Sequence, residues 1–108
     1  MKRITDDAHL KYIRGLPCLL CDDETTTESA HVRYGEGRAG KRLTGLGERP
    51  DDSWTVPLCN KHHADQHTMN EKLFWNGHGV DPVYVALALY RVSGDHEAGC
   101  RIVAANRP

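Results

Sequence analysis

Four side chains that can bind a transition metal stand in two pairs with the same internal spacing. Two residues separate the members of each pair, which are Cys18 with Cys21 and Cys59 with His62. This spacing lets both side chains of a pair reach one tetrahedral ion from a tight turn. Three sulfurs and one nitrogen suit Zn²⁺, which has no geometric preference from its d electrons. The two pairs predict one structural Zn²⁺ that closes a long loop, so that metal binding contributes to the free energy of folding.

The fourth cysteine, Cys100, has no partner at ligand spacing. We expect it to behave as a small buried hydrophobic residue in an apolar helix. The alternative is an all-cysteine metal site in which Cys100 replaces His62. A thiol redox protein built on Cys18 and Cys21 is a further alternative, but it accounts for none of the seven histidines.

Three further histidines form a second group that could bind a metal ion and transfer protons. His63 and His67 are four residues apart, which places both imidazoles on one face of a helix, one turn from each other, where they can hold a divalent cation. His31 lies in a segment of alternating apolar and polar residues, on the face opposite to Ala30 and Val32. A strand histidine that faces a helix-borne pair across a zinc-bound hairpin predicts a hydrolytic site.

The remaining histidines, His9, His78 and His96, have no partner at ligand spacing. We expect each of them on the surface or in a local hydrogen bond rather than at a metal. Phe74 and Trp75 could stack on nucleic-acid bases, but core packing is the expected role in a chain with so few aromatic residues.

Short elements must position these side chains. Acidic residues after Thr5 predict a helix that Thr5 caps and that Gly15 ends. In chain order we then expect strands at 29–34 and 54–58, a helix from 60 to about 69, an apolar stretch at 73–75, a helix at 83–92 and a last helix that starts at 93–95. The second strand should bury one face only, that of Trp54, Val56 and Leu58.

A glycine-rich segment joins the two expected strands. Five of the ten glycines fall between positions 35 and 47, which predicts a long loop from 35 to 50. Five cations against two acids between positions 33 and 49 give this part of the chain a local charge of +3. Two interpretations stay open, a solvated flexible loop and a loop that contacts phosphate groups.

Composition narrows the class of protein. The 108 residues fit one domain with a small core. Fourteen Lys and Arg against fifteen Asp and Glu give a net charge of −1, which excludes a polybasic tail. No run of 18 apolar residues is present, and acids stand where a signal peptide would be apolar, so we expect a cytoplasmic protein without membrane contact. In that compartment cysteines are thiolates or metal ligands rather than disulfides.

Residues 28–33 (ESAHVR) and 54–67 (WTVPLCNKHHADQH) resemble an HNH endonuclease of the ββα-metal class. They are similar to the zinc-containing members found in phages and mobile elements. The resemblance covers roughly residues 18–75 and leaves 76–108 as a helical extension. It implies an α+β fold for one domain over residues 1–108, with a small zinc-stapled ββα-metal core and flanking N- and C-terminal helices.

The resemblance also implies roles for single residues. His31 matches the general base that acts on the attacking water, and His63 and His67 match the ligands of a catalytic divalent metal, Mg²⁺ or another ion. Many members carry an acid or a histidine just before the base as another metal ligand, where this chain has Ala30. Asp52 is the candidate for the role of the family's middle Asn, either holding the hairpin loop or orienting His31. Asp52 or the neighbouring Asp51 could instead supply the missing ligand.

The implied function is a metal-dependent DNA endonuclease, bacterial or phage-encoded, that leaves 5′-phosphate and 3′-hydroxyl ends. Basic residues would contact the DNA phosphates, namely Arg33, Arg38, Lys41 and Arg42. A recombination or phage protein is a second conceivable partner, and no oligomeric state follows from the sequence. The alternative function is a non-catalytic zinc-stabilised module that binds nucleic acid or protein, which Ala30 and the modest net charge favour.

Overall fold

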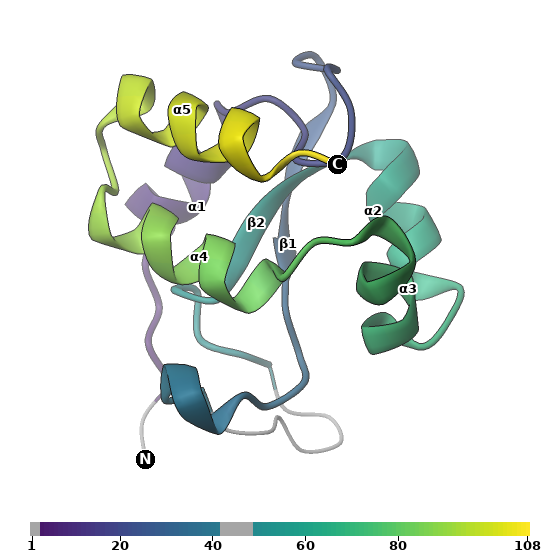
Figure 1. The fold of residues 1–108 in the computed structure, drawn as a ribbon. Helices are drawn as coiled ribbons and strands as arrows, with labels where there is room; N and C mark the ends of the chain where they lie inside the picture. Colours follow the sequence, from purple (N-terminus) through teal and green to yellow (C-terminus); the bar gives the residue numbers. More distant parts are fainter. Residues whose placement is uncertain (1–2, 42–48) are drawn as a thin grey trace.

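The computed structural model describes residues 3–41 and 49–108. Within these ranges the chain forms a small α+β fold with a two-stranded sheet, five α-helices and one 3₁₀ helix (Figure 1). The elements in chain order are α1 (Asp7–Arg14), β1 (Thr27–His31), η1 (Gly37–Ala39), β2 (Thr55–Cys59), α2 (Asn60–His67), α3 (Glu71–His78), α4 (Pro82–Arg91) and α5 (His96–Asn106). The expected α+β class is confirmed. No helix in the two described ranges is long and apolar enough to cross a membrane.

The sheet consists of β1 and β2, which pair antiparallel from Thr27 opposite Cys59 to His31 opposite Thr55. The helices α1 and α2 contact both strands, and α4 contacts β2. β1 shows the expected alternation, because Ala30 is buried and its neighbours are partly exposed. The strand ends at His31, three residues before the predicted end.

β2 is buried on both faces. All five residues from Thr55 to Cys59 are buried, so the prediction of a one-sided strand was wrong. The reason is that α1, α2 and α4 all contact this short strand. Thr55 satisfies its buried hydroxyl by donating a hydrogen bond of 3.0 Å to the carbonyl oxygen of Asp52. Pro57 is tolerated because each strand of a two-stranded sheet is an edge, and its carbonyl accepts the Leu19 amide at 2.8 Å.

α1 begins one residue later than predicted. Its N-cap is Asp6, not Thr5, because the Asp6 carboxylate accepts the backbone amide of His9 at 3.0 Å. The buried face of the helix contains His9 and Ile13. The expectation of a surface position or a local hydrogen bond for His9 was wrong. The ring is fully buried, packs edge-on against Tyr90 and places Nδ1 2.7 Å from the hydroxyl of Ser93, 84 positions along the chain.

The apolar stretch expected at 73–75 is the middle of a helix. α3 starts after Asn70, whose side chain accepts the amide of Leu73, and it ends at Gly79 with φ of +69°. Asn-Gly at 76–77 is a common turn signal, but here the helix runs through both residues. Phe74 and Trp75 are buried in the core as expected.

The C-terminal helices α4 and α5 form a pair that also reaches α1. Asp81 caps α4 by accepting the amides of Val83 and Tyr84, and Asp95 caps α5 by accepting the amide of Ala98. Gly99 on α5 lies against α1, where a Cβ atom would collide with the hydroxyl of Tyr12. That hydroxyl donates a hydrogen bond of 2.6 Å to the carbonyl oxygen of Asp95.

Part of the glycine-rich segment has local structure. Glu36 caps η1 and forms an isolated antiparallel β-bridge with Lys41, so the chain turns back on itself between these two residues. The rest of the expected loop, residues 42–48 with Arg42, lies outside the described residues.

Candidate functional site

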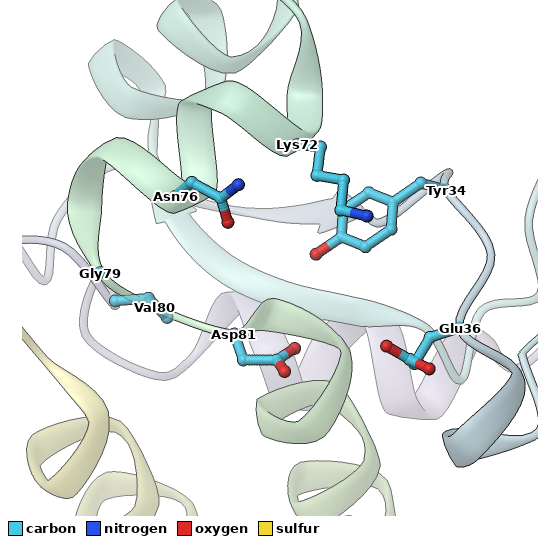
Figure 2. Close-up of a pocket in the computed structure, with 7 residues that line it drawn as sticks. All are labelled: Tyr34, Glu36, Lys72, Asn76, Gly79, Val80 and Asp81. Carbon is cyan, nitrogen blue, oxygen red and sulfur yellow. The ribbon is translucent and has the colours of Figure 1, made fainter.

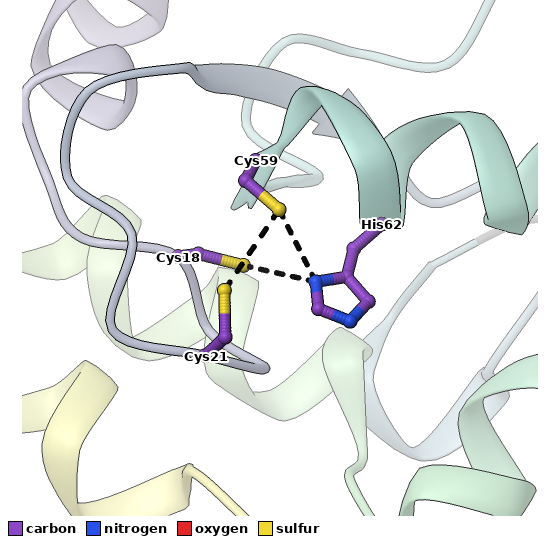
Figure 3. A group of neighbouring side chains, drawn as sticks. All are labelled: Cys18, Cys21, Cys59 and His62. Carbon is purple, nitrogen blue, oxygen red and sulfur yellow. Dashed lines mark hydrogen bonds between the residues drawn. The ribbon is translucent and has the colours of Figure 1, made fainter.

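The two predicted ligand pairs come together in one cluster (Figure 3). The ligand atoms of Cys18, Cys21, Cys59 and His62 all lie within 4.8 Å of one another. Cys18 and Cys21 come from the loop after α1, while Cys59 ends β2 and His62 lies in the first turn of α2. The cluster therefore joins the loop after α1 to the junction between β2 and α2.

The distances within the cluster fit a tetrahedral zinc ion. Two sulfurs at the Zn–S distance of about 2.3 Å lie about 3.8 Å apart at a tetrahedral angle, and a sulfur and a nitrogen lie about 3.6 Å apart. The sulfurs of Cys21 and Cys59 are 3.8 Å apart, and Nδ1 of His62 is 3.7 Å from the Cys18 sulfur and 3.2 Å from the Cys59 sulfur. The donor set and its size both suit Zn²⁺.

The electrostatics of the cluster also favour a cation. Burial and the sulfurs of Cys18 and Cys59 raise the pKa of the Cys21 thiol to about 11. Close thiols resist becoming thiolates at neutral pH unless a positive charge offsets their repulsion, and a bound metal ion supplies that charge. The Leu20 amide lies 3.4 Å from the Cys18 sulfur and donates to it.

Residues far along the chain support the cluster. Arg107 donates a hydrogen bond of 2.9 Å to the carbonyl oxygen of Cys18. The ring of His78, at the end of α3, packs edge-on against the ring of His62. Cys100 lies outside the cluster, with its sulfur 3.5 Å from Nε2 of His96 on the same helix. The four-ligand group in the described part of the chain thus contains His62 and not Cys100.

A pocket of about 410 Å³ brings the second group of histidines together. His31 reaches it from the end of β1, and His63 and His67 reach it from α2. The described residues that line it are Leu10, Arg14, Ser29, His31, Arg33, Arg49, Pro50, His63 and His67. We call this the histidine pocket.

The ring of His31 is held by Asp52. Nε2 of His31 lies 2.9 Å from Oδ1 of Asp52, whose side chain is only 3% exposed. The same oxygen accepts a bond of 2.7 Å from Arg3, and Oδ2 accepts the backbone amide of Asp6 at 2.8 Å. Arg3 also donates to the carbonyl oxygen of Pro50. Residues 3–6 thereby fix the segment that carries Asp52.

The pKa values of this pair favour a neutral histidine beside an ionised acid. Burial lowers the pKa of His31 below 6.5, Asp52 opposes that shift, and the charges of Arg49 and Arg3 add to it. Burial alone would raise the pKa of Asp52, but the Asp6 amide, His31 and Arg3 together lower it. Because a carboxylate only accepts hydrogen bonds, Nε2 of His31 carries the hydrogen and Nδ1 keeps its lone pair.

His63 and His67 point their Nε2 atoms at each other. The two nitrogens are 3.2 Å apart, close to the roughly 3.3 Å between two imidazole nitrogens on one tetrahedral ion. Nδ1 of His63 lies 2.7 Å from Glu28 on β1, so this carboxylate fixes the ring from the opposite side. A carboxylate behind a histidine is a common support for a metal-binding imidazole. The pair offers two metal ligands.

The structure separates the predicted basic residues. Arg33 lines the histidine pocket. Arg38 lies on η1 away from the pocket, and Lys41 is buried with its ammonium over the Trp54 ring. Arg42 belongs to the residues that are not described.

Sequence reasoning missed three residues of this site. Arg3 and Arg14 come from the N-terminal segment, and no local motif there indicates contact with the hairpin. Glu28 was part of the motif that carries the resemblance, but its contact with His63 depends on how α2 lies across β1. Ala30 is fully buried, so it offers no ligand to the pocket.

Comparison with known proteins places the chain in a family. No solved structure matches it significantly. The uncharacterized protein YdfU of Escherichia coli (strain K12) is 25% identical over 67 residues, which are 62% of this chain and 17% of that protein. This chain therefore corresponds to a small part of that longer relative. The profile of one family matches residues 1–93, a range that includes the cysteine–histidine cluster and the histidine pocket. The chain belongs to that family, which is described as "Protein of unknown function (DUF968)".

Proposed function

We propose that this chain is a metal-dependent DNA endonuclease of the HNH type, with a structural Zn²⁺ in the cysteine–histidine cluster. The observation that carries the proposal is the arrangement of the histidine pocket. A strand histidine with a free Nδ1 lone pair shares this pocket with two helix histidines whose nitrogens are spaced for one cation. The zinc cluster would fix this arrangement, because its ligand His62 directly precedes His63.

In the proposed reaction Nδ1 of His31 takes a proton from a water molecule that attacks the phosphorus atom. Asp52 holds the ring in the required tautomer and stabilises the imidazolium that forms. The bond from phosphorus to the 3′ oxygen breaks, and that oxygen leaves with a proton from solvent. His63 and His67 would hold the divalent cation, which when bound stabilises negative charge on the phosphate and on the leaving oxygen.

Nicking of supercoiled plasmid with Mg²⁺, Mn²⁺ or Ni²⁺ tests the proposal. We expect His31→Ala to lower the nicking rate by about 10²- to 10⁴-fold, which is the usual contribution of a general base. His96→Ala is the control, because this histidine is exposed on α5 and remote from the pocket. Bound zinc is measured for all three proteins. Wild-type protein that retains zinc but nicks with none of these metals would overturn the proposed function.

A second candidate function is a non-catalytic zinc module that binds nucleic acid or protein. It is favoured by the pair at His63 and His67, which offers two ligands, and by the burial of Ala30 where many nucleases have a third. The number of metal ions per chain separates the candidates. One tightly bound zinc and no second, labile ion would favour the module, whereas a second ion that is lost in His67→Ala would favour the nuclease.

A further inference from the structure

The histidine pocket collects positive charge in a chain whose net charge is −1. Three arginines line it, Arg14, Arg33 and Arg49, and no acidic residue is among the described lining residues. Two carboxylates do touch the pocket histidines, but each already has a partner. Asp52 is held by Arg3 and His31, and Glu28 by His63.

A second pocket of this protein has a different balance of acidic and basic residues. A hollow of about 310 Å³ is lined by Tyr34, Glu36, Lys72, Asn76, Gly79, Val80 and Asp81. Figure 2 shows the carboxylates of Glu36 and Asp81 around the same space as the ammonium of Lys72. Acidic groups there accompany the cation. The gathering of cations without acids is thus a property of the histidine pocket and not of every hollow on this surface.

Among the described residues, Arg14 and Arg49 have no carboxylate partner that would explain their positions. Arg14 is the last residue of α1, and Arg49 stands just before Pro50; both are exposed, and neither forms an ion pair with a carboxylate in the described part of the chain. A cation at the end of a helix stabilises the helix dipole by a modest amount. That accounts for Arg14 alone and not for the position of Arg49 on the same pocket, where both positive charges would attract a bound anion.

The ligand chemistry follows from the neighbours of these arginines. A guanidinium group matches the oxygens of a phosphate and can donate two hydrogen bonds to it. We propose that Arg14 and Arg49 bind phosphate groups of a nucleic-acid strand in the histidine pocket, beside the phosphate that faces His31. This inference rests on the proposed function and deepens it, because it adds α1, outside residues 18–75, to the substrate-binding surface.

Salt-dependent binding of DNA tests the inference without cleavage. The zinc-loaded protein is titrated into a fluorescently labelled 20-base-pair duplex with no other divalent metal, at salt concentrations between about 50 and 200 mM. We expect Arg14→Gln and Arg49→Gln each to weaken binding roughly three- to tenfold and to lower the slope of log K against log salt by about one. Arg91→Gln is the matched control, because Arg91 is exposed and ends α4 just as Arg14 ends α1. Zinc content and circular dichroism verify the fold of each variant.

The outcomes separate this inference from the proposed function. If the wild type binds and both pocket variants bind as Arg91→Gln does, the inference is overturned and the nuclease proposal stands. If both pocket variants lose affinity but the wild type nicks plasmid with none of the three metals, the subsite stands and the nuclease proposal falls. A wild type that does not bind DNA at any of these salt concentrations would overturn both.

Discussion

The hydrogen bond between Asp52 and His31 decides which ring nitrogen can act as a base. Nε2 faces the buried carboxylate at 2.9 Å, so only Nδ1 can take a proton. The sequence indicated both residues, and orienting His31 was one of three roles considered for Asp52, beside holding the hairpin loop and supplying a metal ligand. Which nitrogen it contacts, and the support from Arg3, could not be predicted. Those details depend on how residues 3–6 lie along residues 50–52, and the two segments are more than 40 positions apart.

Because Asp52 holds the ring of His31, we expect Asp52→Asn to lower the rate of plasmid nicking by about 10²- to 10⁴-fold. The pH dependence gives a second readout. His31 is neutral above its lowered pKa, so the rate should fall as the pH drops through that value. The carboxylate raises the pKa of His31, and its removal should therefore move the acidic limb of the pH–rate profile to lower pH.

The control for this prediction is Glu97→Gln, which removes the same charge from an exposed position on α5. We expect this variant to keep both the rate and the pH profile of the wild type. A wild-type rate in Asp52→Asn, or an acidic limb that moves to higher pH, would contradict the role given to Asp52.

At the scale of helices and strands, the positions of most elements were easier to predict from the sequence than the contacts that bury them. α2 was expected from 60 to about 69 and ends at His67, because the four-residue spacing of His63 and His67 that indicated a helix is a local signal. The burial of β2 on both faces could not be predicted, since Thr55 and Pro57 read as the exposed side of an alternating strand. α3 was missed because Asn76 and Gly77 have the composition of a turn. For β2, contacts with α1, α2 and α4 outweighed the local signal.

The packing of α1 against α5 depends on one glycine. We expect Gly99→Ala to destabilise the protein by about 1–3 kcal/mol, because the new Cβ atom would collide with the Tyr12 hydroxyl and crowd Leu16. Thermal unfolding followed by circular dichroism measures the effect.

Gly77→Ala is the matched control on another helix. A Cβ atom there meets nothing within 4 Å, so alanine should raise stability by about 0.5–1 kcal/mol through its helix propensity. If Gly99→Ala and Gly77→Ala changed the unfolding temperature equally, the predicted collision between a Cβ atom at position 99 and Tyr12 would be contradicted.

For the whole molecule, the cysteine–histidine cluster adds to a small hydrophobic core to which Cys18 and Cys59 themselves belong. It ties the loop after α1 to the start of α2, and structural zinc sites contribute on the order of 10 kcal/mol. That is comparable with the entire stability of an ordinary small domain. The ligand set was readable from the sequence because both pairs are local motifs. The supporting contacts of Arg107 and His78 were not, since Arg107 follows α5 and His78 ends α3, and no local motif links either residue to the two pairs.

We therefore expect Cys21→Ser to lose its zinc and to unfold, and a strong chelator to unfold the wild type. Cys100→Ser is the matched control, because its sulfur lies outside the cluster; it should keep one zinc per chain and the wild-type circular dichroism. Zinc content by atomic absorption and unfolding by circular dichroism test both variants. A folded Cys21→Ser protein with one zinc per chain would refute the ligand assignment.

The hydrogen bond from Arg107 to the carbonyl oxygen of Cys18 concerns how far along the chain the part that folds as one unit extends. The family profile stops at residue 93, whereas α5 begins at His96 and Arg107 follows its last turn. A fragment cut at residue 93 would lose the fully buried Val103, uncover the α1 surface beneath Gly99 and leave the Cys18 carbonyl without this donor. The segment shared with the family is thus shorter than the unit that buries its own core. An expression fragment of this protein should extend through α5 even when only the cysteine–histidine cluster or the histidine pocket is under study.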